Sequence, residues 1–350
     1  MPEAGGWVGS GRPGLGNYCA AMSLTQNSGD DITHRFVDVG GFEMHIAEAG
    51  PAGTGQLVVL LHGFPECWYS WRHQLTALAA AGYHVVAPDQ RGYARTGPAG
   101  GQDDYTMLHL VGDIIGLIDA LGADKAIVAG HDWGAPVAWS TALLRPDRVK
   151  GVIGLSVGYL PRGSTPPVET LRAVYTDGFY ICYFQAPGVA DAELSRDPRD
   201  TFRRLLVAAS GDGTVGGIPV VPQGGGFLDL CPEPPQLPDW LTEDDIDVFV
   251  TEYESSGFSG GLNWYRNLDR TWALTAAWKH AHITVPALFL AGDRDLAVAF
   301  SGGEAMVAGL KDVVPQLRDA RLLPGCGHWT QQERPDEVNA AMLEFIAGLG

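Results

Sequence analysis

The chain has 350 residues, 45% of them hydrophobic, so it can bury a full core. The 41 acidic residues outnumber the 23 basic ones, and the net charge of −18 argues against binding to nucleic-acid phosphates. The five cysteines show no CxxC spacing, and no apolar stretch reaches the roughly 18 residues of a membrane span. We therefore expect a cytoplasmic protein with free thiols and no transmembrane segment.

Residues 1–30 are rich in Gly, Ser and Asn and are predicted to form a disordered extension. From residue 33 onward strand and helix patterns alternate. Strands are predicted at 42–48, 57–61, 83–88, 125–129 and 149–157, and helices at 68–81 and 104–121. This alternation favours an α/β fold, with a mostly parallel sheet covered by helices on both faces.

The alternation stops between residues 159 and 282, where no comparable strand pattern occurs. Helical patterns at 170–183, 198–209, 243–255 and 261–277 surround a Gly/Pro-rich stretch at 211–238. A buried strand returns at 283–291, followed by a helix around 301–310, a strand at 321–324 and a last helix at 335–349. We interpret 31–158 and 283–350 as the α/β core and 159–282 as an inserted helical lid, or cap domain.

The stretch from Gly130 to Ala135 carries an aspartate where a sharp strand-to-helix turn exposes one side chain above a sheet. Small residues two before, two after and three after Asp132 are typical of such a nucleophile elbow. They leave room for the strained backbone of the central residue. A carboxylate there can attack an electrophilic carbon without first losing a proton, unlike a serine hydroxyl. No GxSxG motif occurs, so a serine esterase is not expected.

Hydrolysis of an ester formed on Asp132 needs a general base. His328 follows the last predicted strand between small residues, at the edge where parallel sheets carry their sites. The turn after strand 283–291 offers two carboxylates, of which Asp295 is expected to orient the base and Asp293 to bond the turn's own backbone. No carboxylate follows the strand that ends at 157. The order nucleophile, acid, histidine is that of α/β-hydrolases.

Two further features accompany this constellation. A backbone N–H from the loop at 61–65 and that of Trp133 could form an oxyanion hole. Aromatic residues gather at 179–185 and 262–267, which is typical of packing, although a neutral phenol is also a suitable donor to an alkoxide. No spacing of Cys, His or Asp resembles a metal site, and no cofactor is expected.

Seven segments now carry a resemblance to a known family. In chain order they are HGFPE at 62–66, SWRHQ at 70–74, DQRGY at 89–93, GHDWGA at 130–135, YFQ.PG at 183–188, GLNWYRN at 261–267 and GHWTQQE at 327–333. Together they resemble the soluble-type epoxide hydrolases of the α/β-hydrolase fold, from about residue 31 to the C-terminus. The resemblance implies a cofactor-independent enzyme that converts a small-molecule epoxide and water to a vicinal diol.

By this resemblance Asp132 is the nucleophile, His328 the base and Asp295 its acid partner. The N–H groups of Phe64 and Trp133 become the oxyanion hole, with a cis Phe64–Pro65 bond. Tyr180 and Tyr265 become the lid tyrosines that hold the epoxide oxygen. Phe64, Trp133 and Ile181 are expected to shape the substrate pocket; some family members carry glutamine in place of Ile181.

Where the family usually has Gly, a small residue and Ser after RGY, this chain has Ala94, Arg95 and Thr96. We expect these changes to lie beside the site and to affect substrate preference.

Two alternatives stay open. A haloalkane or haloacid dehalogenase uses the same carboxylate attack and the same base, but stabilises the halide with N–H donors rather than phenols. A non-catalytic ligand-binding protein is the other, because fold alone does not fix function. The natural epoxide, the ring carbon attacked, the enantiopreference and the oligomeric state stay open, with a homodimer among the alternatives.

Overall fold

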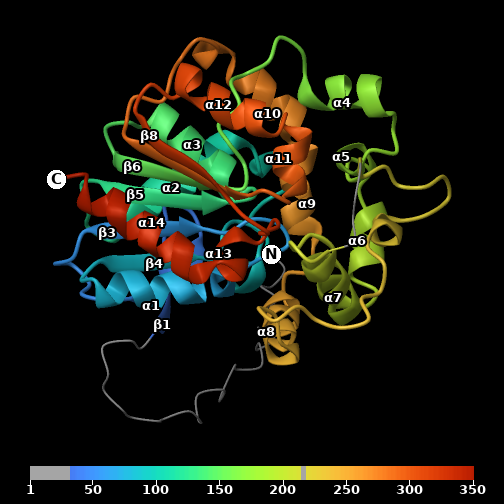
Figure 1. Cartoon of the computed structure of the whole chain (residues 1–350), viewed down its shortest axis with the longest axis horizontal. Coiled ribbons are helices and arrows are strands. Elements are labelled where there is room, and N and C mark those ends of the chain that lie inside the picture. The colour runs from blue at the N-terminus through green and yellow to red at the C-terminus, as the bar shows by residue number, and fades with distance from the viewer. Residues whose placement is uncertain (1–31, 214–217) are drawn as a thin grey trace, which may run out of the picture.

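A computed structural model describes residues 32–213 and 218–350, so the extension predicted at 1–30 lies outside the described residues. Its centre is one eight-stranded sheet in the order β1-β2-β4-β3-β5-β6-β7-β8 (Figure 1). The first two pairings, β1 with β2 and β2 with β4, are antiparallel, and the rest are parallel. In chain order, β1 to β8 are Thr33–Asp38, Glu43–Ala49, Leu57–Leu61, His84–Pro88, Ala126–His131, Val149–Leu155, Ala287–Gly292 and Leu317–Leu323.

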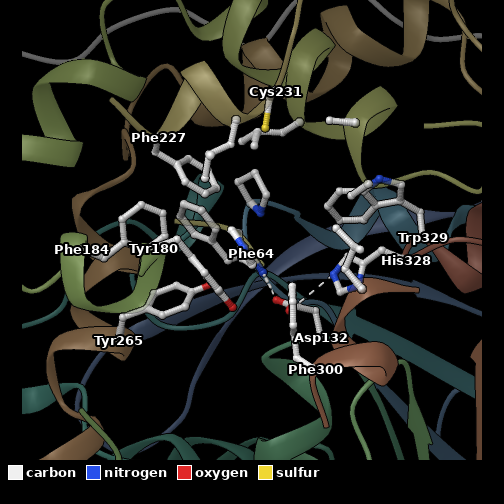
Figure 2. Close-up of a pocket in the computed structure, with 18 of the residues that line it drawn as sticks. Phe64, Asp132, Tyr180, Phe184, Phe227, Cys231, Tyr265, Phe300, His328 and Trp329 are labelled. Carbon is white, nitrogen blue, oxygen red and sulfur yellow. Dashed lines mark hydrogen bonds and ion pairs between the residues drawn. The ribbon is translucent and has the colours of Figure 1, made fainter. Parts of the chain in front are cut away.

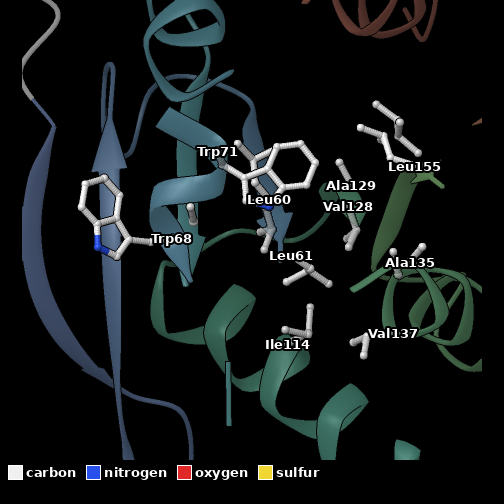
Figure 3. Close-up of a cluster of buried hydrophobic side chains, with 14 of the residues drawn as sticks. Leu60, Leu61, Trp68, Trp71, Ile114, Val128, Ala129, Ala135, Val137 and Leu155 are labelled. Carbon is white, nitrogen blue, oxygen red and sulfur yellow. The ribbon is translucent and has the colours of Figure 1, made fainter. Parts of the chain in front are cut away.

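Helices cover both faces of this sheet, as the alternating pattern predicts. In Figure 1, α1 (Arg72–Ala80) and α14 (Pro335–Ala347) lie on one side, and α2 (Met107–Ala120) and α3 (Gly134–Leu144) on the other. The central strands β3 and β5 are buried along their whole length. Their side chains pack with residues of α2, α3 and η1 (Trp68–Trp71), as Figure 3 shows. Burial of these apolar surfaces is the main favourable term for folding.

A run of helices lies between β6 and β7 in the sequence, and in Figure 1 α5 to α9 lie beyond one end of the sheet. We call this run the α4–η5 segment. Its helices are α4 (Pro167–Tyr175), α5 (Tyr180–Tyr183), α6 (Val189–Leu194), α7 (Pro198–Ala208), η4 (Phe227–Leu230), α8 (Glu243–Tyr253), α9 (Ser259–Arg266), α10 (Leu268–Leu274) and η5 (Ala276–Trp278). No helix in the described residues is long and apolar enough to cross a membrane.

Two helices predicted in this segment are broken. The helix predicted at 170–183 divides at Thr176, whose φ of +68° ends α4, and α5 begins only at Tyr180. The helix predicted at 261–277 divides at Asn267, whose side chain donates to the carbonyl of Gln102 at 2.7 Å. In both places a local contact or backbone turn overrides a continuous helical pattern.

Near the C-terminus several predicted bounds are wrong. The strand predicted at 283–291 begins only at Ala287, directly after Pro286, which has no N–H for the ladder. The helix predicted at 301–310 runs from Glu304 to Val313 as α12, and β8 begins at Leu317 rather than 321. The elements that were not predicted include the mostly exposed edge strand β1 and the short helices α6, α11 (Leu296–Phe300) and α13 (Thr330–Glu333).

The turn between β5 and α3 explains the small residues around Asp132. A Cβ at Gly130 would lie 2.0 Å from the carbonyl oxygen of Gly134, and a Cβ at Gly134 would lie 2.1 Å from that of Leu61. Both glycines are therefore required by close backbone contacts, that of Gly130 within the turn and that of Gly134 with the end of β3.

We predict that Gly134→Ala lowers the free energy of unfolding by about 3 kcal/mol or more, because its Cβ overlaps the backbone of β3. The matched control is Gly112→Ala in the exposed part of α2, where a Cβ meets no atom within 4 Å. Alanine there should raise stability by roughly 0.5–1 kcal/mol. Urea denaturation of both variants measures the difference, and equal effects would contradict this account of the turn.

Candidate active site

Asp132 projects from the turn between β5 and α3 with a backbone φ of +48°, in the region that L-residues rarely adopt. One oxygen of its carboxylate, Oδ1, accepts the N–H of Phe64 at 2.7 Å. Phe64 lies in the loop that follows β3, the strand next to β5, and its bond to Pro65 is cis, as the resemblance implies. The backbone of Asp132 is thus strained, and its carboxylate is held by a backbone donor from the neighbouring loop.

The second oxygen of Asp132 faces His328, whose Nε2 lies 3.5 Å from Oδ2 (Figure 2). On the other side of the ring, Nδ1 lies 3.0 Å from Oδ1 of Asp295. Asp295 follows β7 and His328 follows β8, so the carboxyl ends of three parallel strands bring these residues together. The structure therefore places all three predicted residues in one row.

Charge and burial act in opposite directions on this row. Burial alone would lower the pKa of His328, but the carboxylates of Asp295 and Asp132 raise it well above its ordinary value. Burial likewise opposes ionisation of Asp295, yet contact with His328 and a hydroxyl donor lowers the pKa of this carboxyl. The imidazole is accordingly a strong proton acceptor while both carboxylates are charged.

The hydroxyl donor is Ser156, a residue that the sequence analysis did not identify. Its Oγ donates to Oδ2 of Asp295 at 2.5 Å and lies 2.9 Å from Nδ1 of His328. Ser156 is fully buried, directly follows β6 and has a φ of +69°. No carboxylate follows this strand in the sequence, and a single serine there carries no local pattern that indicates a role. Asp293 also differs from expectation, because it accepts the N–H of Gly325 in the turn after β8 rather than bonding its own turn.

Two tyrosines of the α4–η5 segment face Asp132. In Figure 2 the hydroxyl groups of Tyr180 and Tyr265 point toward one another and toward the carboxylate, and the two ring centroids lie 6.1 Å apart. Burial and the nearby charge of Asp132 raise the pKa of both phenols, that of Tyr265 well above its ordinary value. Both hydroxyls therefore stay protonated donors at neutral pH.

A cavity of about 200 Å³ lies between the sheet and the α4–η5 segment, bordered by Asp132, His328 and both tyrosines. Apart from these four and the buried thiol of Cys231, its lining side chains are apolar. They are Phe64, Pro65, Val157, Phe184, Leu205, Ala208, Ala209, Pro219, Phe227, Leu230, Leu296, Ala297, Phe300 and Trp329. Such a cavity suits an apolar small molecule oriented by a few polar groups.

Two residues expected in the pocket differ from prediction. Ile181 does not line the cavity; it packs on a separate cluster with Val168 and Phe179, because consecutive helical residues point about 100° apart and Tyr180 faces inward. The ring of Trp133 also lies outside the lining and packs edge-on against Tyr265, with centroids 5.0 Å apart. Its backbone N–H remains at the start of α3, beside Asp132.

A buried acid, Glu66, bonds to its own loop, to His131 and to residues that follow His328. Glu66 is fully buried and accepts from the N–H of Gly63, and its Oε2 lies 2.7 Å from Nδ1 of His131. The other nitrogen of His131 donates to the carbonyl of His328 at 2.7 Å. Burial alone would raise the pKa of Glu66, but these partners lower it to about 2. Gln331 and Gln332 donate to its second oxygen.

Within residues 32–213 and 218–350, no three His, Cys, Asp or Glu side chains are grouped as metal ligands. The polar groups that border the described cavity are a carboxylate, an imidazole, two phenols and a thiol.

Residues 56–182 match a family model described as alpha/beta hydrolase fold, the class that this sheet and site define. The chain is 45% identical over 320 residues to Epoxide hydrolase A of Mycobacterium tuberculosis, covering 91% of this chain and 98% of that protein. It is 43% identical over 321 residues to Epoxide hydrolase 3 of Siraitia grosvenorii, covering 91% and 99%. The crystal structure of Epoxide Hydrolase A from Mycobacterium thermoresistibile is 48% identical, with a TM-score of 0.85 over 91% and 99%. This chain belongs to the epoxide hydrolase family.

The network around Glu66 predicts a pH-dependent stability. The pKa of Glu66 in the folded chain, about 2, lies below its ordinary value of 4.5, so the ionised form stabilises the fold above pH 4.5. We expect Glu66→Gln to lower the free energy of unfolding by about 3 kcal/mol at pH 7. The difference should shrink as the pH falls from 4.5 toward 2, when the wild-type carboxyl also becomes protonated.

Urea denaturation at pH 7 and at pH 3 measures this difference. Asp147→Asn is a control, because Asp147 pairs with Arg145 at the exposed surface, where ion pairs contribute little. A loss for Glu66→Gln that stays constant with pH would contradict the ionised role of this residue.

Proposed function

We propose that this protein hydrolyses apolar epoxides to vicinal diols through a covalent ester on Asp132. One observation carries the proposal: the carboxylate lies between a backbone donor, an imidazole and two phenols that line the same cavity. Phe64 donates to Oδ1 at 2.7 Å, and Nε2 of His328 lies 3.5 Å from Oδ2. Tyr180 and Tyr265 face the same carboxylate across the cavity (Figure 2).

In the first half-reaction the epoxide oxygen accepts hydrogen bonds from Tyr180 and Tyr265. A carboxylate oxygen of Asp132 attacks one ring carbon from the opposite side, and the carbon–oxygen bond of the ring breaks. A phenol gives its proton to the departing alkoxide and later regains one from solvent. General acid assistance of this kind contributes about 10²–10⁴ in rate.

In the second half-reaction His328 takes a proton from water, and the resulting hydroxide attacks the carbonyl carbon of the ester. Asp295 holds the imidazole in place and balances its positive charge. The oxyanion is stabilised by the N–H groups of Phe64 and Trp133, a contribution of about 10²–10³ in rate for each donor. Collapse breaks the ester bond, and the imidazolium returns its proton to the leaving oxygen. The acid formed on Asp132 loses its proton to solvent, which balances the proton regained by the phenol, and the diol is released.

The donor groups of the site favour epoxides over the two alternatives. A dehalogenase needs N–H donors around the departing halide, whereas the groups that face Asp132 across the cavity are phenols. A ligand-binding protein has no need of a base and acid aligned behind a strained carboxylate.

A single-turnover experiment in ¹⁸O-water with styrene oxide and excess enzyme tests the covalent route. We expect an unlabelled diol, because its new oxygen comes from Asp132, and one ¹⁸O in the peptide that contains this residue. Mass spectrometry of diol and digested protein gives both readings. Asp132→Ala, the control, should lose turnover by at least about 10³. Label entering the diol directly would contradict the proposal.

The phenols should act only in ring opening. We expect Tyr180→Phe and Tyr265→Phe each to slow ester formation by roughly 10–10², and the double variant by more, because the alkoxide loses its donors. The rate of ester hydrolysis should change little. Rapid-quench measurement of ester and diol separates the two steps. A double variant that keeps epoxide turnover, or that gains halide release from 1-bromobutane, would favour the dehalogenase alternative.

A further inference from the structure

Glu333, at the end of α13 (Thr330–Glu333), carries a buried carboxylate that the proposed chemistry does not use. Its Oε2 accepts the backbone N–H groups of Gly211 at 2.8 Å and Gly327 at 2.9 Å, and its Oε1 accepts that of Trp329 at 3.0 Å. Burial raises the pKa of Glu333, and the three N–H donors lower it, with the effect of burial prevailing. Among the described residues no basic side chain forms an ion pair with it, so backbone N–H groups are its partners.

Two of these three donors flank His328 in the sequence. The backbone of His328 itself is fixed from two further directions: its N–H donates to the carbonyl of Ala209 at 2.8 Å, and its carbonyl accepts from His131 at 2.7 Å. The backbone N–H groups of residues 327, 328 and 329 thus all donate hydrogen bonds. The position of the imidazole depends on what these groups are bonded to.

We call residues 325–329 the His328 turn. Some of its hydrogen-bond partners lie at the end of α7, more than 110 residues away in the chain. Ala209 and Gly211 follow that helix directly, and the indole N–H of Trp329 donates to the carbonyl of Leu206 at 2.7 Å. The contact leaves no room for side chains. A Cβ at Gly211 would lie 2.2 Å from the carbonyl oxygen of Gly325, and a Cβ at Gly327 would lie 2.2 Å from the nitrogen of Gly211.

The same end of α7 also borders the substrate cavity, because Leu205, Ala208 and Ala209 line it together with His328. The α7 end and the His328 turn therefore form one packed unit across the cavity wall. Glu333 is the side chain that bonds to both parts of this unit at once. Removing its side chain would leave three buried N–H donors without this acceptor, which is costly at each of them.

We propose that Glu333 is a positioning residue for the second half-reaction: it ties the His328 turn to the end of α7 and so keeps the imidazole aligned with the Asp132 ester. This role rests on the proposed function. Ring opening transfers no proton to His328, whereas ester hydrolysis needs its Nε2 to take a proton from the attacking water. A small displacement of the ring therefore slows only hydrolysis.

The test is rapid-quench kinetics of wild type and Glu333→Gln with styrene oxide, with the ester detected by intact-protein mass. Glutamine keeps the shape but places an NH₂ group against at least one backbone N–H. We expect ester formation within about twofold of wild type, and hydrolysis slower by roughly 10–10², as for a catalytic group displaced by about 1 Å. The ester should become the main enzyme form at steady state.

A second variant protects the test if Glu333→Gln fails to fold. Gly211→Ala forces the α7 end away from the 325–328 turn without changing any charge, and it should produce the same accumulation of ester. The control is Asp245→Asn. Asp245 is a buried acid of α8 that accepts from the hydroxyl of Tyr69 in the core at 2.9 Å and does not contact the His328 turn. We expect it to leave the partition between the two steps unchanged.

Two outcomes overturn the proposal and can be told apart. If wild type forms an ester but Glu333→Gln and Gly211→Ala partition as wild type does, or lose both steps equally, Glu333 is a purely structural residue. If wild type forms no ester at all, the covalent route itself fails, and the positioning role fails with it.

Discussion

The site depends on one arrangement, an imidazole held between two carboxylates. Nδ1 of His328 lies 3.0 Å from Asp295, and Nε2 lies 3.5 Å from Asp132. Both charges raise the pKa of His328 against the effect of burial. In the proposed mechanism Asp132 becomes a neutral ester, so one of these charges disappears. The pKa of His328 then falls, and the ring is released from its first partner when it must act on water. Ester formation itself therefore prepares the base for the second step.

Burial of these charges is unfavourable, and hydrogen bonds from the surrounding residues offset that penalty. Asp295 is fully buried, yet it accepts from Ser156, from the N–H of Ala297 and from His328. A buried charge without such partners would be neutralised instead. Glu66 and Glu333 are also buried acids held by hydrogen bonds: Glu66 bonds with His131, the N–H of Gly63 and two glutamines, and Glu333 accepts from three backbone N–H groups. Buried acids that bond to backbone fix loops, and here each of them fixes a loop that carries a proposed catalytic residue.

The residues that sequence alone predicts are those with a local signature. Asp132 stands out because Gly130 and Gly134 on either side of it are required by close backbone contacts. Asp295 stands out because it follows a buried strand, and His328 because it follows the last strand and lies between small residues. The strand patterns also predict most of the sheet, since continuous apolar runs have few other uses.

Ser156 and Glu333 have no such signature. Their roles arise from contacts between residues far apart in the chain. Ser156 reaches Asp295 only because β6 and β7 pair with Leu155 opposite Leu290. Glu333 reaches Gly211 only because α7 packs on the turn after β8. The breaks at Thr176 and Asn267 were missed for a similar reason: a helical pattern continues through both, and contacts outside the pattern interrupt the helix.

The three residues that depart from the family pattern show how such contacts change an interpretation. We expected Ala94, Arg95 and Thr96 to border the site and to affect substrate preference, yet none of them lines the cavity. Arg95 instead forms a bidentate pair with Glu252 of α8, which also accepts from the indole of Trp68.

The flanking two residues adapt the backbone to this pairing. Thr96 donates to the carbonyl of Asp89 at 2.6 Å, and Ala94 has a φ of +44°, a conformation that glycine adopts at lower cost. The substitutions thus lie where the α4–η5 segment meets the core, at a joint between α8 and the loop after β4. These three residues therefore affect how firmly α8 is held to the core. They can influence substrate preference only through this contact, because none of them lines the cavity.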